Sequence, residues 1–167
     1  NIEGSGMVGK AGFSGRLFSL LSREQVNVIL ITQSSSEHSI TFAVNPSDAV
    51  KARVLIEQEF ELELLAVKLE PVRVENNLSI LAIVGENMKK TPGISGKLFY
   101  ALGRIGVNVV AIAQGSSEYN ISVIIYHDDL SKALNAVHDA FFSELQKTLN
   151  VFMVGVGNIG TELLSQI

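Results

Sequence analysis

Short apolar runs alternate along the chain with stretches in which apolar residues return at helical spacing. The run at residues 78–84 is rich in β-branched residues and predicts a strand. A glycine-rich loop at 85–93 follows, and Leu98, Phe99 and Leu102 then lie on one stripe of a predicted helix. A strand, a glycine-rich loop and an amphipathic helix therefore form one unit of the pattern.

This unit occurs twice, because the sequence repeats itself with a shift of 81 residues. Residues 12–44 and 93–125 are identical at 16 of 33 positions without a gap, which indicates a duplicated module. In each copy a serine, Ser14 or Ser95, stands where a helix N-cap is expected. Only residues 2–3 remain of the first strand of the first copy. We therefore interpret the chain as a fragment of a longer protein.

A hairpin and a second helix complete each copy. In the first copy, strands at 26–32 and 39–44 flank a polar turn at 33–37. Asp48 and Asp129 are expected to open the second helices. The apolar face of that helix in the second copy follows the spacing of about 3.6 residues and consists of Leu130, Ala133, Leu134, Val137 and Phe141.

The order strand, helix, strand, strand, helix and closing strand predicts an α+β fold. We expect two ferredoxin-like modules packed side by side, each an antiparallel sheet backed by two helices. The first module is placed at residues 1–77 and the second at 78–147. In the first module the closing strand is expected within 64–75, where Pro71 suits only an edge or a bend.

The last residues carry a different pattern. A predicted buried strand at 149–154 runs into Gly155, Gly157 and Gly160 and then into a predicted helix, which is the context of a dinucleotide-binding motif. These glycines permit a tight turn and the close approach of a pyrophosphate. We interpret residues 148–167 as the start of an incomplete dinucleotide-binding domain. The alternative is that the strand supplies the missing fourth strand of the second module.

Composition and charge narrow the classes of partner. Of 167 residues, 47% are apolar and 18% are charged, which is sufficient for a substantial core. Thirteen Lys and Arg against 17 Asp and Glu give a net charge of −4, so we expect no nucleic acid as partner. The absence of cysteine excludes disulfides and thiolate chemistry and permits a reducing compartment. No apolar run approaches the roughly 18 residues of a membrane span, and no secretory signal is recognised.

Three features together resemble the bifunctional aspartate kinase/homoserine dehydrogenase family. They are the tandem modules, the paired segments ITQSSSE at 31–37 and IAQGSSE at 112–118, and the segment VFMVGVGNIG at 151–160. The resemblance covers essentially the whole chain. It implies paired ACT regulatory domains up to about residue 147, followed by the first strand and helix of a homoserine dehydrogenase, with a kinase domain upstream.

The resemblance also implies a function. In that family the regulatory pair binds an end-product amino acid, threonine in bifunctional members, and feeds back on the enzyme activities. The parent chain is then an aspartate kinase fused to an NAD(P)-dependent homoserine dehydrogenase, located in the cytoplasm and dimerising through its ACT domains. ATP and NAD(P) belong to the absent domains. We expect no cofactor, no metal and no complete active site in this chain itself.

An amino-acid effector is a zwitterion, so its site needs donors for the carboxylate and acceptors for the ammonium. The N–H groups at the start of the first helix of each copy suit the carboxylate. Carbonyl groups of the adjoining strand, near Val28 or Val109, suit the ammonium. The amide of Gln33 or Gln114 can both donate to and accept from a threonine hydroxyl.

In the family, the residues that match Gln33 and Gln114 are associated with effector binding, and the glycine loop lines the pocket. The further candidates are Met7, Gly12 and Phe13 in the first copy, Met88, Gly93 and Ile94 in the second, and Asn27 and Asn108 at the strand starts. Asn27 and Gln33 have the same parity but lie roughly 20 Å apart along a strand. We therefore hypothesise a site between modules, with the glutamine from one and the loop, asparagine and helix start from its neighbour.

Other functions remain open at this point. The leading alternative is a structural dimerisation module without ligand binding. An RNA-binding ferredoxin-like domain is disfavoured because the central strands carry Ile, Val and Ala in place of stacking aromatics and basic residues. The chain itself lacks the residues for catalysis, since the serines at 34–36 have no His and acid arranged around them. His38, His127 and His138 have no ligand-like spacing, and the acidic pair 128–129 indicates a helix start.

Overall fold

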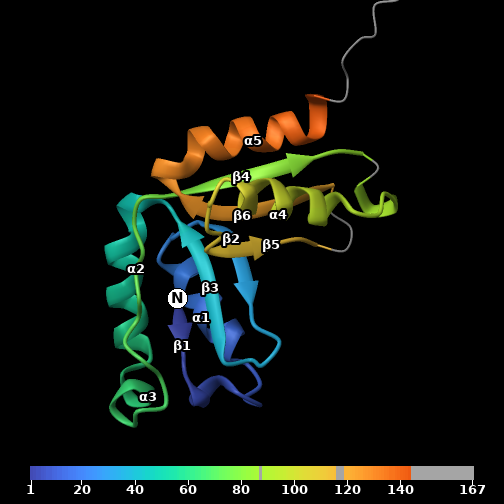
Figure 1. The fold of residues 1–167 in the computed structure, drawn as a ribbon. Helices are drawn as coiled ribbons and strands as arrows, with labels where there is room; N and C mark the ends of the chain where they lie inside the picture. Colours follow the sequence, from blue (N-terminus) through green and yellow to red (C-terminus); the bar gives the residue numbers. More distant parts are fainter. Residues whose placement is uncertain (87, 116–118, 144–167) are drawn as a thin grey trace, which may run out of the picture.

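The computed structural model describes residues 1–86, 88–115 and 119–143 (Figure 1). Within these ranges the chain forms two α+β modules, one after the other, and each contains a three-stranded antiparallel sheet. The strand order is β1-β3-β2 in the first sheet and β4-β6-β5 in the second. The two copies of the repeat therefore share one topology, and the expected α+β fold is confirmed.

The first module surrounds its own core. Its elements are β1 (Ile2–Glu3), the 3-10 helix η1 (Ser5–Met7), α1 (Phe13–Arg23), β2 (Val28–Gln33), β3 (Ser39–Val44), α2 (Pro46–Glu59) and α3 (Glu61–Leu65). Leu17 and Leu21 of α1, Ile40 of β3 and Ile56 of α2 are almost completely buried together. The predicted amphipathic stripe of α1 is thus its core face.

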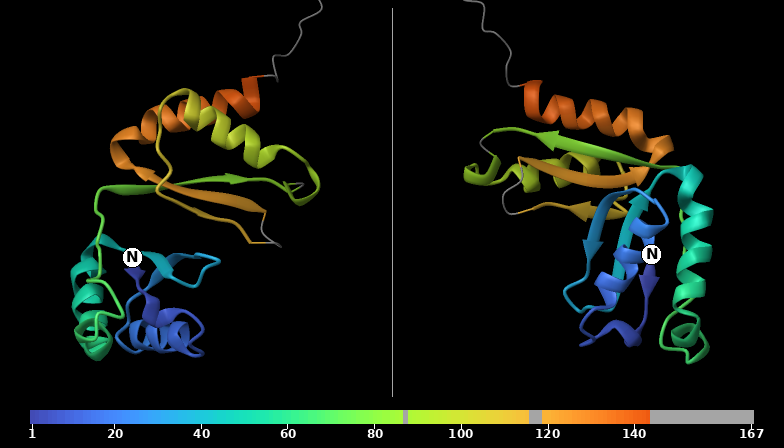
Figure 2. Two further views of the ribbon diagram at one scale, coloured as in Figure 1. Left: turned by 60° about the horizontal axis from the view of Figure 1, so that its bottom comes forward. Right: turned by 180° about the vertical axis from the view of Figure 1, so that it is seen from behind.

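The second module repeats this arrangement. Its elements are β4 (Leu78–Val84), η2 (Met88–Lys90), α4 (Ile94–Arg104), β5 (Ala111–Ala113), β6 (Asn120–Tyr126), η3 (His127–Asp129) and α5 (Leu130–Phe142). The two long helices lie together on one face of the sheet (Figure 2). Leu98, Leu102, Ile121 and Val137 fill the core between them. No helix within the described ranges is long and apolar enough to cross a membrane.

The first helix of each module begins at a glycine and not at the expected serine. The N-cap residues of α1 and α4 are Gly12 and Gly93, with φ angles of 87° and 89°. Ser14 and Ser95 are therefore the second residues of their helices. The chain enters each helix through the left-handed region, which glycine adopts without the penalty of a Cβ atom.

The second helices begin close to the expected aspartates. Helix α2 starts at Pro46 after the N-cap Asn45, so Asp48 lies in its first turn. Asp129 is the residue before α5. Proline at the first helical position and an acidic first turn are both typical of a helix start.

The closing strand expected in the first module is not a regular strand. The chain after α3 instead follows the edge of β1 irregularly. The N–H of Glu70 donates to the carbonyl of Glu3 at 2.8 Å, and the N–H of Arg73 donates to that of Asn1 at 3.1 Å. Pro71 lies between them and has no N–H to continue the ladder.

The two modules contact each other where β2 lies beside β5. Leu30 on β2 and Ile124 on β6 are buried, at 7% and 4% exposure, yet they belong to neither core. Leu30 lies opposite Ala43, whereas Ile124 lies opposite Ala111. In the repeat, Leu30 corresponds to Ala111 and Ala43 corresponds to Ile124. The large side chain is therefore on β2 in the first copy and on β6 in the second. These faces of the two sheets cover each other.

Candidate functional site

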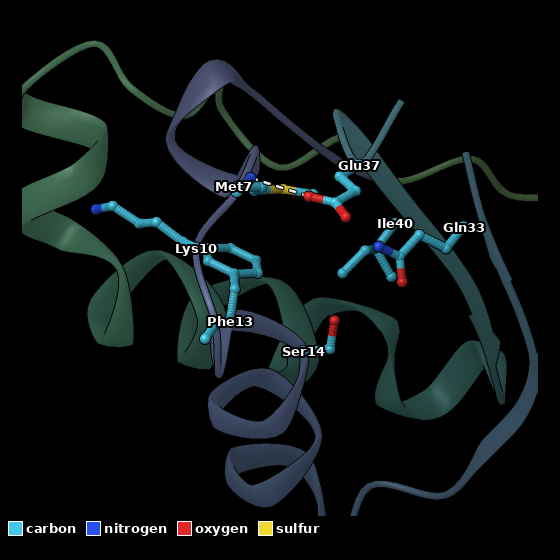
Figure 3. A pocket seen from close by; sticks show the side chains of 9 residues that line it. Met7, Lys10, Phe13, Ser14, Gln33, Glu37 and Ile40 are labelled. Carbon is cyan, nitrogen blue, oxygen red and sulfur yellow. Dashed lines mark hydrogen bonds between the residues drawn. The ribbon is translucent and has the colours of Figure 1, made fainter. Parts of the chain in front are cut away.

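A pocket of about 320 Å³ lies in the first module where three segments meet (Figure 3). The segments are the glycine loop after β1, the start of α1 and the β2–β3 hairpin. The lining residues are Met7, Gly9, Lys10, Ala11, Phe13, Ser14, Gln33, Glu37 and Ile40. The pocket thus combines a loop, a helix start and a strand end within one copy of the repeat.

The loop wall of the pocket is fixed by contacts that leave no room for larger residues. A Cβ atom on Gly4 would lie 2.2 Å from the carbonyl oxygen of Lys68. The N–H of Gly6 donates to that same oxygen at 2.8 Å. Met7 follows directly, and its side chain is 4% exposed and part of the core. Glycines at these positions therefore let the loop lie tightly against residues 68–69.

The start of α1 supplies hydrogen-bond donors. The first main-chain bond of the helix runs from the N–H of Arg16 to the carbonyl of Gly12, at 2.9 Å. The N–H groups of residues 13–15 precede that bond, and no side chain caps the helix. Ser14 points its hydroxyl into the pocket (Figure 3). This end of the helix carries the positive end of the helix dipole and suits a carboxylate.

Gln33 is the last residue of β2 and directs its amide into the pocket (Figure 3). It lies opposite Ile40, a core residue, so both side chains are on the helix-facing side of the sheet. A register shift between Val28 and Leu30 places one extra residue in β2 and reverses the alternation of side chains. The prediction that Gln33 and Asn27 project from the same face of the strand is therefore wrong.

Glu37 brings a carboxylate to the rim of the pocket. It lies in the turn between β2 and β3 with a φ of 55°, and its Oε2 accepts a hydrogen bond from the N–H of Gly9 at 2.9 Å. Lys10 is on the same rim, but its side chain extends away from Gln33 (Figure 3). An acidic group at the rim and donors at the helix start match the two charges of a zwitterion.

The structure brings some predicted residues together and separates others. Three predicted residues of the first copy line the pocket, namely Met7, Phe13 and Gln33, and Gly12 directly precedes the helix start. Asn27 and Val28 lie at the opposite end of β2 and do not line it. Gln33 meets the loop and helix start of its own module, which differs from the hypothesis of a pocket shared between modules.

The predicted residues of the second copy occupy equivalent places in their module. Met88 lies in η2, Gly93 and Ile94 open α4, Asn108 and Val109 precede β5, and Gln114 follows it. The counterpart of Glu37 falls in residues 116–118, outside the described ranges. The motif glycines Gly155, Gly157 and Gly160 also lie outside them. In the described part of the chain, no cluster of three His, Cys, Asp or Glu could hold a metal ion.

Outside the glycine loop and the helix start, which the sequence analysis expected as segments, two residues of the pocket were missed, namely Glu37 and Ile40. Glu37 belongs to the Ser-Ser-Glu segment that both copies share, so the repeat itself marks it. Ile40 carries no such mark, because an apolar residue in a strand indicates only core. Its place under the pocket depends on the pairing of β3 with β2.

Arg16 forms a charged cluster beside the pocket. Its guanidinium hydrogen-bonds Glu59 and Glu63, each at 2.7 Å, and lies 4.3 Å from the ring centre of Phe60. The hydrogen bond to Glu59 raises the pKa of Arg16. Burial raises the pKa of Glu63, but the bonds from Arg16 hold it below its ordinary value. Phe60 in turn stacks 4.6 Å from Phe13 of the pocket. The cluster ties the helix start to the end of α2 and to α3.

Known proteins resemble this chain over its whole length. Residues 1–60 and 81–141 match a family model described as ACT domain. A bifunctional aspartokinase/homoserine dehydrogenase of Haemophilus influenzae is 44% identical over 167 residues, and a chloroplastic one of Zea mays is 43% identical. The chain spans 20% and 18% of the lengths of these two relatives. The resemblance indicated by the repeat and the final segment is confirmed.

Solved structures show the same arrangement of elements. The ligand-free regulatory subunit of aspartate kinase from Thermus thermophilus is 30% identical, with a TM-score of 0.67, over 84% of this chain and 91% of that one. Clostridium acetobutylicum aspartate kinase is 26% identical, with a TM-score of 0.70, over 84% of this chain and 32% of that one. The tandem modules described above are thus also found in these proteins.

Proposed function

The chain belongs to the ACT domain family, and we propose that it is the regulatory region of an aspartate kinase fused to a homoserine dehydrogenase. The similarity to a separate regulatory subunit and to bifunctional enzymes supports this proposal. Phosphoryl transfer with ATP and the NAD(P)-dependent reaction would belong to other parts of such a protein. The role of this chain would be to bind an amino-acid effector and to alter those activities.

The pocket beside Gln33 carries the proposal. The α-carboxylate of the effector would accept from the N–H groups of residues 13–15 and from the Ser14 hydroxyl. The ammonium would donate to the Glu37 carboxylate on the rim. A volume of about 320 Å³ is at the lower end of ordinary ligand pockets and suits a small molecule. A single free amino acid matches both the size and the charges of the site.

Threonine is the effector that the amide of Gln33 favours. The amide can donate to and accept from the threonine hydroxyl at the same time. Where the bound effector covers the amide of Gln33, an analogue without the hydroxyl leaves this amide unpaired, at a cost of about 1 to 3 kcal/mol. This cost corresponds to roughly a 5- to 150-fold weaker dissociation constant.

Thermal unfolding with added amino acids tests the proposal. At about 100 times its dissociation constant, threonine should stabilise the chain by roughly 2.7 kcal/mol. Valine at equal concentration should stabilise it by only roughly 0.3 to 1.8 kcal/mol, because it binds about 5- to 150-fold more weakly, and lysine and methionine should not stabilise it. Gln33→Ala should reduce the threonine shift to roughly the range expected for valine, and the matched control Gln58→Ala on the exposed face of α2 should keep it. Stabilisation by none of the four amino acids would favour a purely structural module.

We also propose that the chain pairs with a second copy through its strand edges. Strands β2 and β5, which contact each other within the chain, are each at the end of their sheet in the described part of the chain. Ile29, Ile31 and Ile112 on these strands are between 45% and 49% exposed. An edge with exposed apolar residues is a template for pairing with another chain. Sedimentation equilibrium should show a dimer that Ile31→Lys weakens.

A further inference from the structure

Residues 66–73, called the strap here, lie against the loop wall of the pocket. The N–H of Gly6 donates to the carbonyl of Lys68, and a Cβ atom on Gly6 would be 2.9 Å from the Cβ of Lys68. A Cβ atom on Gly4 would be 2.7 Å from the Cα of Leu69. Because the loop and the strap touch through main-chain atoms with no spare room, one cannot move toward the other independently.

Glu63 joins the strap to the helix start of the pocket. Its carbonyl accepts from the N–H groups of Lys68 and Leu69, at 2.9 and 3.2 Å. Its carboxylate accepts from Arg16 at 2.7 Å. Arg16 lies in the first turn of α1, two residues after Ser14 of the pocket. The loop, the helix start and the strap therefore form a closed ring of contacts around one side of the pocket.

The chain that continues from the strap is fixed to the second module. Asn77 accepts a hydrogen bond on its carbonyl from the N–H of His127, at 2.8 Å. The side-chain amide of Asn77 donates to Asp128 at 3.2 Å. Before this point the strap follows β1 through the bond from Glu70 to Glu3. The strap is thus attached to the pocket at one end and leads to the end of β6 at the other.

We propose that the strap transmits occupancy of the pocket to the second module, with Arg16 and Glu63 as positioning residues. This inference rests on the proposed function. A carboxylate bound at the N–H groups of residues 13–15 draws the helix start and the loop together around it. The loop then displaces Lys68 through the Gly6 contact, while the Arg16–Glu63 pair holds the other side of the ring. The displacement continues along the strap to Asn77.

Amide hydrogen exchange measured residue by residue by NMR tests the ring without any ligand. Arg16→Met and Glu63→Gln should each speed exchange at Lys68 by about fivefold or more, because its acceptor Glu63 is no longer held. Exchange at Gly6 should rise with it, although the N–H of Gly6 donates to the carbonyl of Lys68 and to neither changed side chain. Arg53→Met, an exposed arginine of α2, is the matched control and should leave both rates unchanged. Wild-type rates at Gly6 in both variants would overturn the proposal.

Threonine supplies the second arm of the experiment. At saturation it should slow exchange at Gly6, Lys68 and His127 of the wild-type chain by about fivefold, and in Arg16→Met the effect at His127 should fall below about twofold. Calorimetric binding of threonine with protection confined to the loop would overturn the strap and leave the pocket intact. Absence of any threonine binding would instead contradict the proposed function. The hydrogen-exchange comparison of the variants without ligand would still test the ring of contacts.

Discussion

The main-chain N–H of Gly9 donates a hydrogen bond to the carboxylate of Glu37, with a nitrogen–oxygen distance of 2.9 Å. This bond joins the glycine loop to the hairpin turn across the rim of the pocket. It holds one carboxylate oxygen in place and leaves the other available to accept from an ammonium group. The rim is therefore formed before a ligand enters.

Glu37→Gln removes the negative charge of this residue but keeps its hydrogen bond in the rim of the pocket. The amide oxygen can still accept from Gly9, so the loop should keep its position, but the ammonium loses a charged acceptor. Because hydrogen bonds to charged groups contribute about 1.5 to 3 kcal/mol, threonine should bind at least about tenfold more weakly. Isothermal titration calorimetry measures this change. Glu61→Gln on α3 is the control, and equal affinities of the two variants would show that Glu37 does not hold the ammonium.

Replacing glycine by alanine should have opposite effects on the free energy of unfolding at two nearby positions at the start of α1. Gly12 has a φ of 87°, so Gly12→Ala should lower the free energy of unfolding by about 1 to 2 kcal/mol. Gly15 is inside the helix, and a Cβ atom there would meet nothing within 4 Å, so Gly15→Ala should raise it by about 0.5 to 1 kcal/mol. Urea denaturation compares the two, and a destabilising Gly15→Ala would contradict the helix boundary.

Much of the fold could be predicted because local signals and the repeat agree. The strands at Ser39–Val44 and Leu78–Val84 have the bounds that the apolar runs predict. The serine caps were wrong because the sequence Gly-x-Ser allows two helix starts, and only the φ of the glycine distinguishes them. The closing strand after α3 was predicted with its interruption at Pro71, but its irregular path depends on contacts with β1 and the loop.

The candidate site could be predicted only in part. Gln33, Met7 and Phe13 were marked by the repeat and the family resemblance, and they meet in one pocket. The shared site between modules was inferred from the roughly 20 Å between Asn27 and Gln33, which a parity count had placed on one face of an uninterrupted strand. The register shift after Val28 arises from the pairing of β2 with β3, and residues within β2 give no local sign of it. A long-range pairing thus decided which residues meet.

The ion pair beside the pocket predicts a pH-dependent contribution to stability. The pKa of Glu63 is lower in the folded chain than its ordinary value, so its stabilisation is present above the ordinary pKa and is lost as the pH falls through the folded one. The side chain of Arg16 is 42% exposed, so the gain should stay below about 1 kcal/mol. Urea denaturation of wild type and Glu63→Gln should differ at pH 7, and the difference should shrink as the pH falls below the ordinary pKa of a glutamate. A difference that does not vary with pH would contradict this assignment.

The contact between the modules predicts a large effect at one residue of β2 and a small one at its neighbour. Leu30 is 7% exposed and belongs to neither core, whereas Ile29 is 49% exposed. Leu30→Ala should therefore cost about 2 to 3 kcal/mol of unfolding free energy, and Ile29→Ala less than about 1 kcal/mol. Differential scanning calorimetry measures both. Similar small losses would mean that the second module does not cover Leu30.

A crystal structure of the chain with saturating threonine tests the central claim most directly. The account predicts one threonine in the pocket of the first module, with its carboxylate at the N–H groups of residues 13–15 and its hydroxyl on the amide of Gln33. Its ammonium should lie within hydrogen-bond distance of Glu37. Threonine bound only elsewhere, or a pocket left without it at saturation, would contradict the account.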